Sequence, residues 1–254
     1  MRELISFPCE GDTLAGTLDD APRSTGLLIV SGGNEIRCGA HRGMALLAAE
    51  LAGGGVPVFR FDRRGIGDSD GHNHGYAESG PDIAAAVQSF RTLAPQVKRI
   101  VGFGNCDAAT ALALFHRDAG IESLVLANPW VGEEHDGLPP AEAIRSHYAD
   151  RVKDPKQWLR LATGSINIGK VFKGLRKAST ALSDTGNPIV ERMAAALEGT
   201  PHRFLLANRD NTAIRFAGAW PYGGDKRECS TDSHSFARPG DAAWLAAQLR
   251  EALS

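Results

Sequence analysis

Two kinds of hydrophobic pattern take turns along the chain. Short apolar runs of strand length, bounded by glycine, proline or polar residues, occur at 26–30, 56–62, 99–104, 121–130 and 202–210. Segments with apolar residues three or four positions apart occur at 41–55, 81–95, 108–115 and 241–253. Buried strands that alternate with amphipathic helices predict an α/β fold, in which a mostly parallel, doubly wound sheet carries helices on both faces.

Two segments depart from this alternation. Near the amino end, alternating residues at Glu3–Cys9 and Thr13–Leu18 flank "EGD" and predict an antiparallel hairpin. Residues 131–198 contain scattered helical patterns and no convincing strand. We therefore expect a core formed by residues 1–130 and 199–254, with a helical cap insertion over residues 131–198.

Composition supports one large folded domain and argues against several partners. Of the 254 residues, 43% are hydrophobic and 23% are charged, which suffices for a packed core. A net charge of -2 disfavours nucleic acid as the main partner. No apolar stretch approaches the roughly 18 residues of a membrane span, and the first residues do not resemble a signal peptide. We expect a cytoplasmic protein without a membrane span.

Positive charge is concentrated in the predicted cap. Nine Lys or Arg and three Asp or Glu between Ala141 and Lys177 give +6, so the rest of the chain sums to -8. One interpretation is an ordinary solvated helical surface. The other is a positive rim that attracts an anionic or carrier-bound substrate.

The cysteines are the first candidates for chemistry. Their spacing shows neither a C-x-x-C pair nor histidines at zinc-ligand distance, so we expect no disulfide framework and no metal or other cofactor. Cys9, Cys38 and Cys229 fit small buried hydrophobes. Cys106 differs, because it stands in "VGFGNCDAAT", where a strand turns sharply into a helix.

Such a turn needs small neighbours, and Gly104 and Ala108 supply them. At the tip, the amino end of the helix favours a thiolate over a thiol. The backbone amide of Asp107 would face a developing oxyanion. By itself this five-residue pattern is weak evidence for a nucleophile.

Four other stretches give the turn its context. "FDRRGIGDSDG" follows one strand, "LLIVSGGN" ends another, "LLANRDNTA" carries an acid and "TDSHSF" carries a histidine. The order of nucleophile, acid and histidine matches the α/β-hydrolase pattern. Over essentially its whole length the chain resembles the α/β-hydrolase superfamily. With "GGNEIRCGAHRG", "CDAA" and "NPWV" as well, it is similar to the exosortase A system-associated hydrolase 1 group.

The resemblance implies a catalytic triad. Cys106 would be the nucleophile, His234 the general base and Asp210 the acid that orients the imidazole. Each has a plainer interpretation: a buried structural thiol, a surface histidine and a helix-cap aspartate. Asp232, two positions before His234, is the rival acid.

Further residues are assigned around this triad. We expect Gly33 and Asp107 to donate backbone N–H groups to an oxyanion, with Asn34 replacing Gly33 if the loop shifts by one residue. Asn34 and Trp130 are candidate substrate-binding residues. Trp158, Phe172 and Trp220 could also line an acyl pocket, although each fits ordinary core. The arginines of "DRRG" are expected to brace loops, and Asp68 and Asp70 to form a turn rather than a metal site.

The sequence therefore predicts a hydrolase of small-molecule esters or thioesters that works through an acyl-cysteine intermediate. An acyltransferase with the same triad is one alternative, because an acyl-cysteine can be intercepted by other nucleophiles. A non-catalytic binding module of the same fold is the other.

Overall fold

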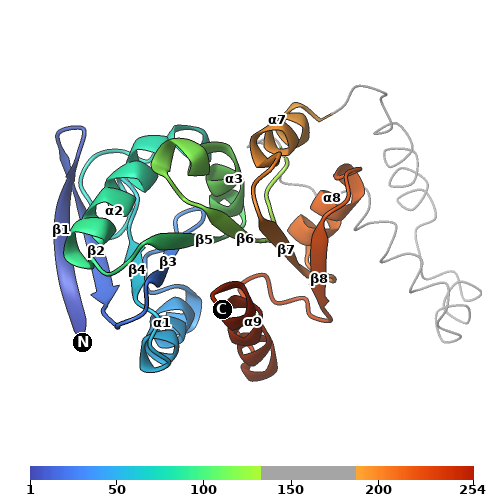
Figure 1. Ribbon diagram of the computed structural model, residues 1–254. Helices are drawn as coiled ribbons and strands as arrows, with labels where there is room; N and C mark the ends of the chain where they lie inside the picture. Colours follow the sequence, from blue (N-terminus) through green and yellow to red (C-terminus); the bar gives the residue numbers. More distant parts are fainter. Residues whose placement is uncertain (133–186) are drawn as a thin grey trace, which may run out of the picture.

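The computed structural model describes residues 1–132 and 187–254, which are built around one sheet. Within these residues the sheet has eight strands in the order β1-β2-β4-β3-β5-β6-β7-β8 (Figure 1). The strands are β1 (Arg2–Cys9), β2 (Asp12–Asp19), β3 (Thr25–Val30), β4 (Val58–Phe61), β5 (Arg99–Asn105), β6 (Ser123–Ala127), β7 (His202–Ala207) and β8 (Asp225–Cys229). From β4 through β3 to β8 every neighbouring pair is parallel, which confirms the predicted mostly parallel sheet.

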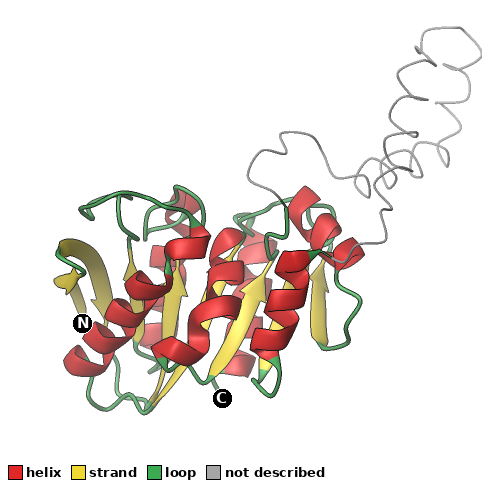
Figure 2. Ribbon diagram, turned by 90° about the horizontal axis from the view of Figure 1, so that it is seen from above, coloured by secondary structure: helices red, strands yellow, loops and turns green. Residues whose placement is uncertain are grey.

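Helices cover both faces of the sheet (Figures 1 and 2). They are α1 (Gly43–Gly53), α2 (Gly80–Leu93), α3 (Asp107–Ala119), α7 (Pro188–Leu197), α8 (Asn211–Ala219) and α9 (Pro239–Ala252), with short 3-10 turns η1 (Ala40–Arg42) and η2 (Tyr76–Glu78). Side chains of α2, α3, α7 and α8 pack on one face, whereas those of α1 and α9 pack on the other.

The central strand β3 shows why the sequence builds two cores. Its odd positions, Leu27 and Ile29, join the cluster under α1 and α9, whereas Leu28 and Val30 join the cluster under α2 and α3. A strand buried on both faces has no polar alternation, which explains the continuous apolar run. Each such side chain contributes roughly 1.5–3 kcal/mol when fully buried.

The predicted amino-terminal hairpin is confirmed. β1 pairs antiparallel with β2, from Arg2 opposite Asp19 to Cys9 opposite Asp12. Between them, Glu10 and Gly11 take φ values of 49° and 96°. Two successive residues with positive φ make the tight turn that suits the right-handed twist of a hairpin.

The order of the strands reverses at β3, and this reversal determines where a site can form. β4, the next strand along the chain, lies on one side of β3, and β5 lies on the other. The loops that follow β3 and β5 therefore diverge at the carboxyl edge of the sheet. Such a switch point is where open α/β sheets hold their ligands.

Some elements differ from the predictions made on sequence. α1 begins at Gly43, not at position 41, because His41 and Arg42 have left-handed φ values of 51° and 61°. α8 and β8 had no prediction. β8 ("DKREC") is an edge strand with mostly exposed side chains, so pairing with β7 defines it and hydrophobic periodicity does not.

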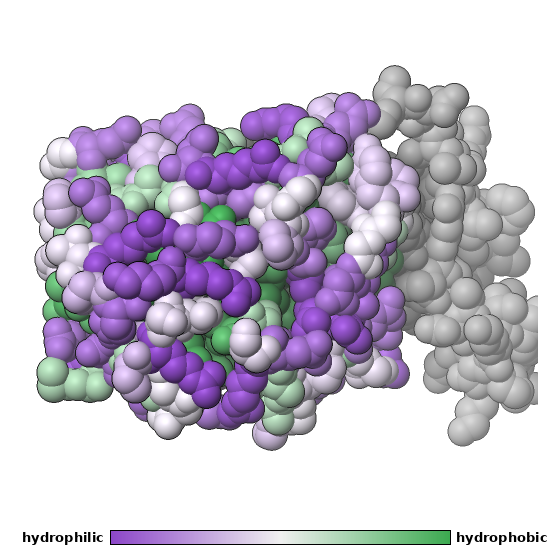
Figure 3. Space-filling model, viewed as in Figure 1, coloured by the Kyte–Doolittle hydropathy of each residue, from purple (hydrophilic) through white to green (hydrophobic). Residues whose placement is uncertain are grey.

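Most of the predicted cap, residues 133–186, lies outside the described residues. Its last part, α7, packs on α3 and buries Val190, Met193 and Leu197 in the same cluster. Among the described residues, no helix is long and apolar enough to cross a membrane. The surface in Figure 3 is mostly hydrophilic, and hydrophobic residues show mainly in its recessed middle.

Candidate active site

Cys106 occupies a strained turn between β5 and α3. Its φ of 63° and ψ of -128° lie outside the regions that L-residues ordinarily adopt, a conformation that costs on the order of 1–3 kcal/mol. A Cβ on Gly104 would lie 2.8 Å from the carbonyl carbon and oxygen of Ala108. The chain can therefore pass from β5 into α3 this sharply only with a small residue at position 104.

His234 lies between an acid and the sulfur. Its Nδ1 is 2.9 Å from Oδ2 of Asp210, and the side chain of Cys106 is close enough to affect the pKa of the ring. Burial favours the neutral ring and lowers its pKa. The hydrogen bond to Asp210, the proximity of the Cys106 side chain and the charge of the Asp210 carboxylate outweigh burial and raise the pKa of His234 to about 10. The raised pKa favours the imidazolium form of the ring, and a cation at this place would stabilise a thiolate.

Asp210 has two tasks at once. Besides meeting His234, its Oδ2 accepts the backbone N–H groups of Thr212 and Ala213 at 3.0 and 3.1 Å, as the N-cap of α8. These bonds hold the carboxylate still for the imidazole. The rival acid, Asp232, is 58% exposed and pairs instead with Arg238 at 2.5 Å. Of the two acids considered from the sequence, the structure joins Asp210 to His234.

Asn128 is a residue of this site that sequence reasoning missed. It is fully buried at the end of β6 and has a positive φ of 42°. Its Nδ2 donates to the backbone oxygen of His234 at 3.0 Å and to Oδ1 of Asn105 at 2.9 Å. Its Oδ1 accepts from the N–H of Ala207 at 2.8 Å. One amide thus ties the histidine loop to β5 and β7. The asparagine of "NPWV", a polar residue inside the apolar run 121–130, was the available signal.

The loop after β3 approaches the elbow closely. A Cβ on Gly32 would lie 2.4 Å from the backbone oxygen of Asn105, so only glycine fits there. The N–H of the next residue, Gly33, donates to Oδ1 of Asp107 at 2.6 Å. In this arrangement the predicted oxyanion donor Gly33 is therefore already used. The backbone amide of Asp107 opens α3, where the first N–H groups have no acceptor within the helix.

Arg63 braces this region from a third loop. Only 2% of its side chain is exposed. Its Nη1 donates to Oγ of Ser79 at 2.9 Å, and its Nη2 donates to the backbone oxygen of Gly33 at 2.8 Å and to Oδ2 of Asp107 at 3.2 Å. Arg63 thus connects Ser79, the loop after β3 and the start of α3, the kind of bracing contact expected for these arginines.

The two candidate substrate-binding residues lie on different loops, Asn34 after β3 and Trp130 after β6. The backbone N–H of Trp130 donates to the oxygen of Cys106 at 3.2 Å, and the guanidinium of Arg215 stands 5.7 Å over the Trp130 ring. Asn34 is exposed and accepts from Nδ2 of Asn73 at 3.0 Å. Trp220 packs in the core against Phe204 and Phe216. Trp158 and Phe172 lie outside the described residues.

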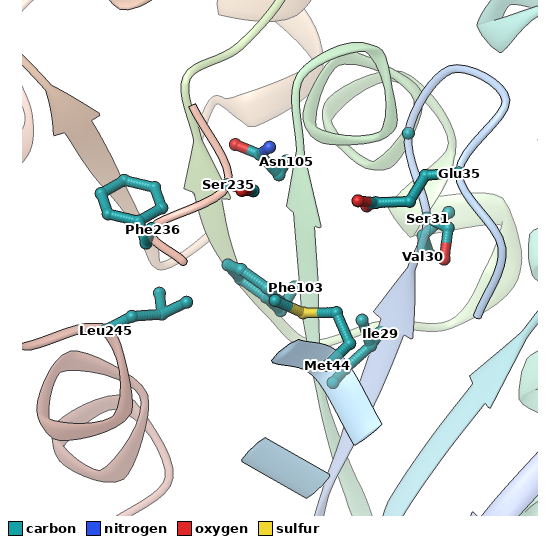
Figure 4. Close-up of a pocket in the computed structure, with 11 residues that line it drawn as sticks. Ile29, Val30, Ser31, Glu35, Met44, Phe103, Asn105, Ser235, Phe236 and Leu245 are labelled. Atoms are coloured by element: carbon teal, nitrogen blue, oxygen red, sulfur yellow. The ribbon is translucent and has the colours of Figure 1, made fainter. Parts of the chain in front are cut away.

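A small cavity adjoins the elbow on the side of α1 and α9 (Figure 4). Ser31, Glu35, Asn105 and Ser235 supply its polar lining, and Phe103 is among its apolar residues. Its volume of about 10 Å³ accommodates one water molecule and no acyl chain. Asp68, which was expected to form a turn, pairs with Arg37 at 2.9 Å. In the described ranges, no group of three His, Cys, Asp or Glu side chains is arranged to hold a metal ion.

The sheet, its helices and the elbow define an α/β hydrolase. Residues 23–182 match the family described as serine aminopeptidase, S33, which is more than half of the chain, and the protein belongs to that family. The family description names a serine, whereas the residue at the elbow of this chain is Cys106.

Solved structures agree on the fold. An esterase of Pyrococcus furiosus, Pf2001, is 17% identical with a TM-score of 0.60, covering 100% of this chain and 94% of its own. The α/β hydrolase GrgF from Penicillium sp. sh18 is 17% identical with a TM-score of 0.64, covering 98% and 97%. An α-β serine hydrolase homologue from Coxiella burnetii is 16% identical with a TM-score of 0.59, covering 99% and 97%. No curated protein matches the chain significantly.

Proposed function

We propose that this protein hydrolyses carboxylic esters or thioesters, with Cys106 as nucleophile, His234 as general base and acid, and Asp210 as the orienting acid. One observation carries the proposal. His234 is hydrogen-bonded to Asp210 and lies near the side chain of Cys106, which has a strained conformation directly after β5. A positioned imidazolium beside a sulfur is the arrangement that activates a cysteine nucleophile.

The chemistry proceeds in two halves. The thiolate of Cys106 attacks the carbonyl carbon, and the carbonyl oxygen becomes an oxyanion. This intermediate collapses as the C–O or C–S bond of the leaving group breaks, and His234 gives its proton to the departing alcohol or thiol. Neutral His234 then takes a proton from water, which attacks the acyl-thioester. Collapse of the second intermediate releases the carboxylic acid and restores the thiolate with its imidazolium.

Esters and thioesters fit this nucleophile better than amides do. A thiolate is a good leaving group, so a tetrahedral intermediate formed from an amide tends to expel the sulfur and return to substrate. Only protonation of the amine in step avoids this return. For this chain we therefore favour ester hydrolysis, the activity in the name of the Pyrococcus furiosus structure, over the aminopeptidase activity in the family description.

Two other functions have an observation in their favour. The acyl-thioester formed on Cys106 is reactive towards alcohols and amines, which favours acyl transfer as the second candidate. The carboxylate of Asp107 on the Gly33 N–H, where an oxyanion donor was expected, favours a binding module without catalysis.

Alkylation of Cys106 distinguishes an enzyme from a binding module. We expect iodoacetamide to modify Cys106 at neutral pH at least about tenfold faster than a free thiol, because its reactive form is stabilised by the imidazolium. His234→Ala should remove this advantage, and His72→Ala, at an exposed histidine, should not. Peptide mass spectrometry separates Cys106 from the other three cysteines. Alkylation at the rate of a free thiol in the parent protein would exclude the triad.

Turnover then identifies the reaction. After brief exposure to p-nitrophenyl esters of increasing acyl length, the intact protein should gain one acyl mass on Cys106. Added alcohols or amines that appear in the product, at the expense of the free acid, would establish transfer as the main activity.

The substrate class is a separate part of the proposal. We place the chain beside the exosortase A system-associated hydrolase 1 group on "GGNEIRCGAHRG", "CDAA" and "NPWV". The basic segment from Ala141 to Lys177 lies outside the described residues, and its charge of +6 favours an anionic or carrier-bound substrate. Charge reversal at Arg151, Lys153 and Lys156 should raise KM and flatten its dependence on salt. An unchanged KM at low and high salt would assign the segment to ordinary surface.

A further inference from the structure

The side chain that follows the nucleophile lies in an unexpected place. Oδ1 of Asp107 accepts the Gly33 N–H at 2.6 Å. A Cβ built on Gly32 would be 2.9 Å from this same oxygen and 3.4 Å from the Cβ of Cys106. The carboxylate therefore lies against the loop after β3, and the Cys106 side chain approaches the same loop. This is where the oxygen of a reacting carbonyl would have to bind, if Gly33 is to donate to it.

The carboxylate is held there from two directions. The N–H of Gly33 donates to Oδ1, and the guanidinium of Arg63 donates to Oδ2 at 3.2 Å. Arg63 is itself buried and also holds the backbone oxygen of Gly33 at 2.8 Å. One arginine thus fixes both ends of the Gly33–Asp107 contact. Because the guanidinium lies beside Oδ2, the carboxylate can stay bound to Arg63 when the hydrogen bond between Oδ1 and the Gly33 N–H breaks.

We propose that Asp107 is a positioning residue that closes the oxyanion hole of the resting protein. Its carboxylate must release the Gly33 N–H before a carbonyl oxygen can be stabilised there. The inference rests on the proposed function, since it concerns the oxyanion formed by attack of Cys106. It assigns the side chain of Asp107 a role that opposes the one expected for its backbone amide.

Two physical effects follow from the closed arrangement. The Gly33 N–H must exchange a charged acceptor for the substrate, and hydrogen bonds to charged groups are the strong ones. Until the carboxylate moves, its negative charge also repels the oxyanion in a partly buried site. Both effects raise the energy of the transition state more than that of bound substrate, because only the transition state carries the full oxyanion charge. The effect should therefore appear in kcat and leave KM nearly unchanged.

Asp107→Asn tests the proposal with little change of shape. A carboxylate offers an oxygen to each of its two donors, Gly33 and Arg63, whereas an amide has one oxygen and an NH₂ group that cannot accept. The variant must give up one contact, and it carries no charge to repel an oxyanion. We expect kcat on p-nitrophenyl acetate to rise about tenfold. A trifluoromethyl ketone, which adds to the sulfur and places an oxyanion in the hole, should bind about tenfold more tightly.

Controls separate this inference from the proposed function. Alkylation by iodoacetamide displaces iodide and needs no oxyanion hole, so Asp107→Asn should change it far less than it changes kcat. Asp118→Asn, at an exposed position late in the same helix, should alter none of these values. If Cys106 alkylates rapidly and depends on His234, yet Asp107→Asn has unchanged or lower kcat and ketone affinity, the closing role is wrong and the triad survives. If alkylation is slow, both fail together.

A measurement on the unaltered protein covers the case in which the variant does not fold. On addition of the trifluoromethyl ketone, the carboxyl carbon of Asp107 and the amide proton of Gly33 should both shift in NMR spectra, as the bond between them breaks. Adduct formation on Cys106 with neither signal shifted would overturn the proposal.

Discussion

Asp210→Asn provides the sharpest test of the triad, because it separates structural support from catalysis. Asparagine and aspartate are equally good N-caps, so the variant keeps the start of α8. It removes the negative charge whose Oδ2 lies 2.9 Å from Nδ1 of His234. The fold should survive, while the imidazolium loses its charged partner.

The size of the effect follows from the bond that is lost. A hydrogen bond to a charged group contributes about 1.5–3 kcal/mol, which corresponds to a loss in kcat/KM of about 10- to 150-fold. The pKa of His234 should fall from about 10 towards the ordinary 6.5, since burial lowers it and the hydrogen bond to the Asp210 carboxylate is what mainly raises it. Asp210→Ala should show the same loss in kcat/KM and a further loss of about 1 kcal/mol in the free energy of unfolding, through the missing cap.

The assay compares kcat/KM on a p-nitrophenyl ester, the titration of the His234 ring by NMR and urea denaturation. Asp232→Asn is the matched control, because Asp232 is the neighbouring acid and pairs with Arg238. Wild-type kcat/KM in Asp210→Asn would refute the reasoning, as would a larger loss in Asp232→Asn. A loss confined to Asp210→Ala would show that the carboxylate serves α8 and has no part in catalysis.

Two further predictions concern stability. Gly104→Ala should lower the free energy of unfolding by about 1–3 kcal/mol, since the added Cβ lies 2.8 Å from backbone atoms of Ala108; Gly53→Ala, at the last residue of α1 with open space around it, should change it by less than about 0.5 kcal/mol. Equal denaturant midpoints for the two variants would contradict the tight elbow. The pKa of His234 is raised on folding from 6.5 to about 10, so its contribution to stability is complete below pH 6.5 and is lost as pH rises through about 10. The unfolding free energy of the parent should therefore decline relative to that of His234→Gln across this range in urea titrations, and parallel pH curves would count against the charged ring.

Local patterns in the sequence were sufficient for the scaffold and for the tip of the elbow. Continuous apolar runs predicted the buried strands β3 to β7, because a strand covered on both faces excludes polar side chains. The small residues Gly104 and Ala108 around Cys106 predicted the turn, because their effect is steric and reaches only a few positions along the chain. The same reasoning missed β8, whose exposed, charged residues become a strand only by pairing with β7.

Tertiary structure determined which residues contact one another at the carboxyl edge of the sheet. The sequence offers two acids, Asp210 and Asp232, as partners for His234. The fold joins His234 to Asp210, because β7 and β8 are neighbours and the loops that follow them are hydrogen-bonded to each other. The contact of Asp107 with Gly33 spans 74 positions, and no periodicity or motif reports it. The rotamer of such a side chain depends on donors brought in by other loops, here Gly33 and Arg63. The sequence by itself thus determined the fold class and the candidate nucleophile, whereas only the packed chain determined which acid holds the imidazole and which group occupies the predicted oxyanion hole.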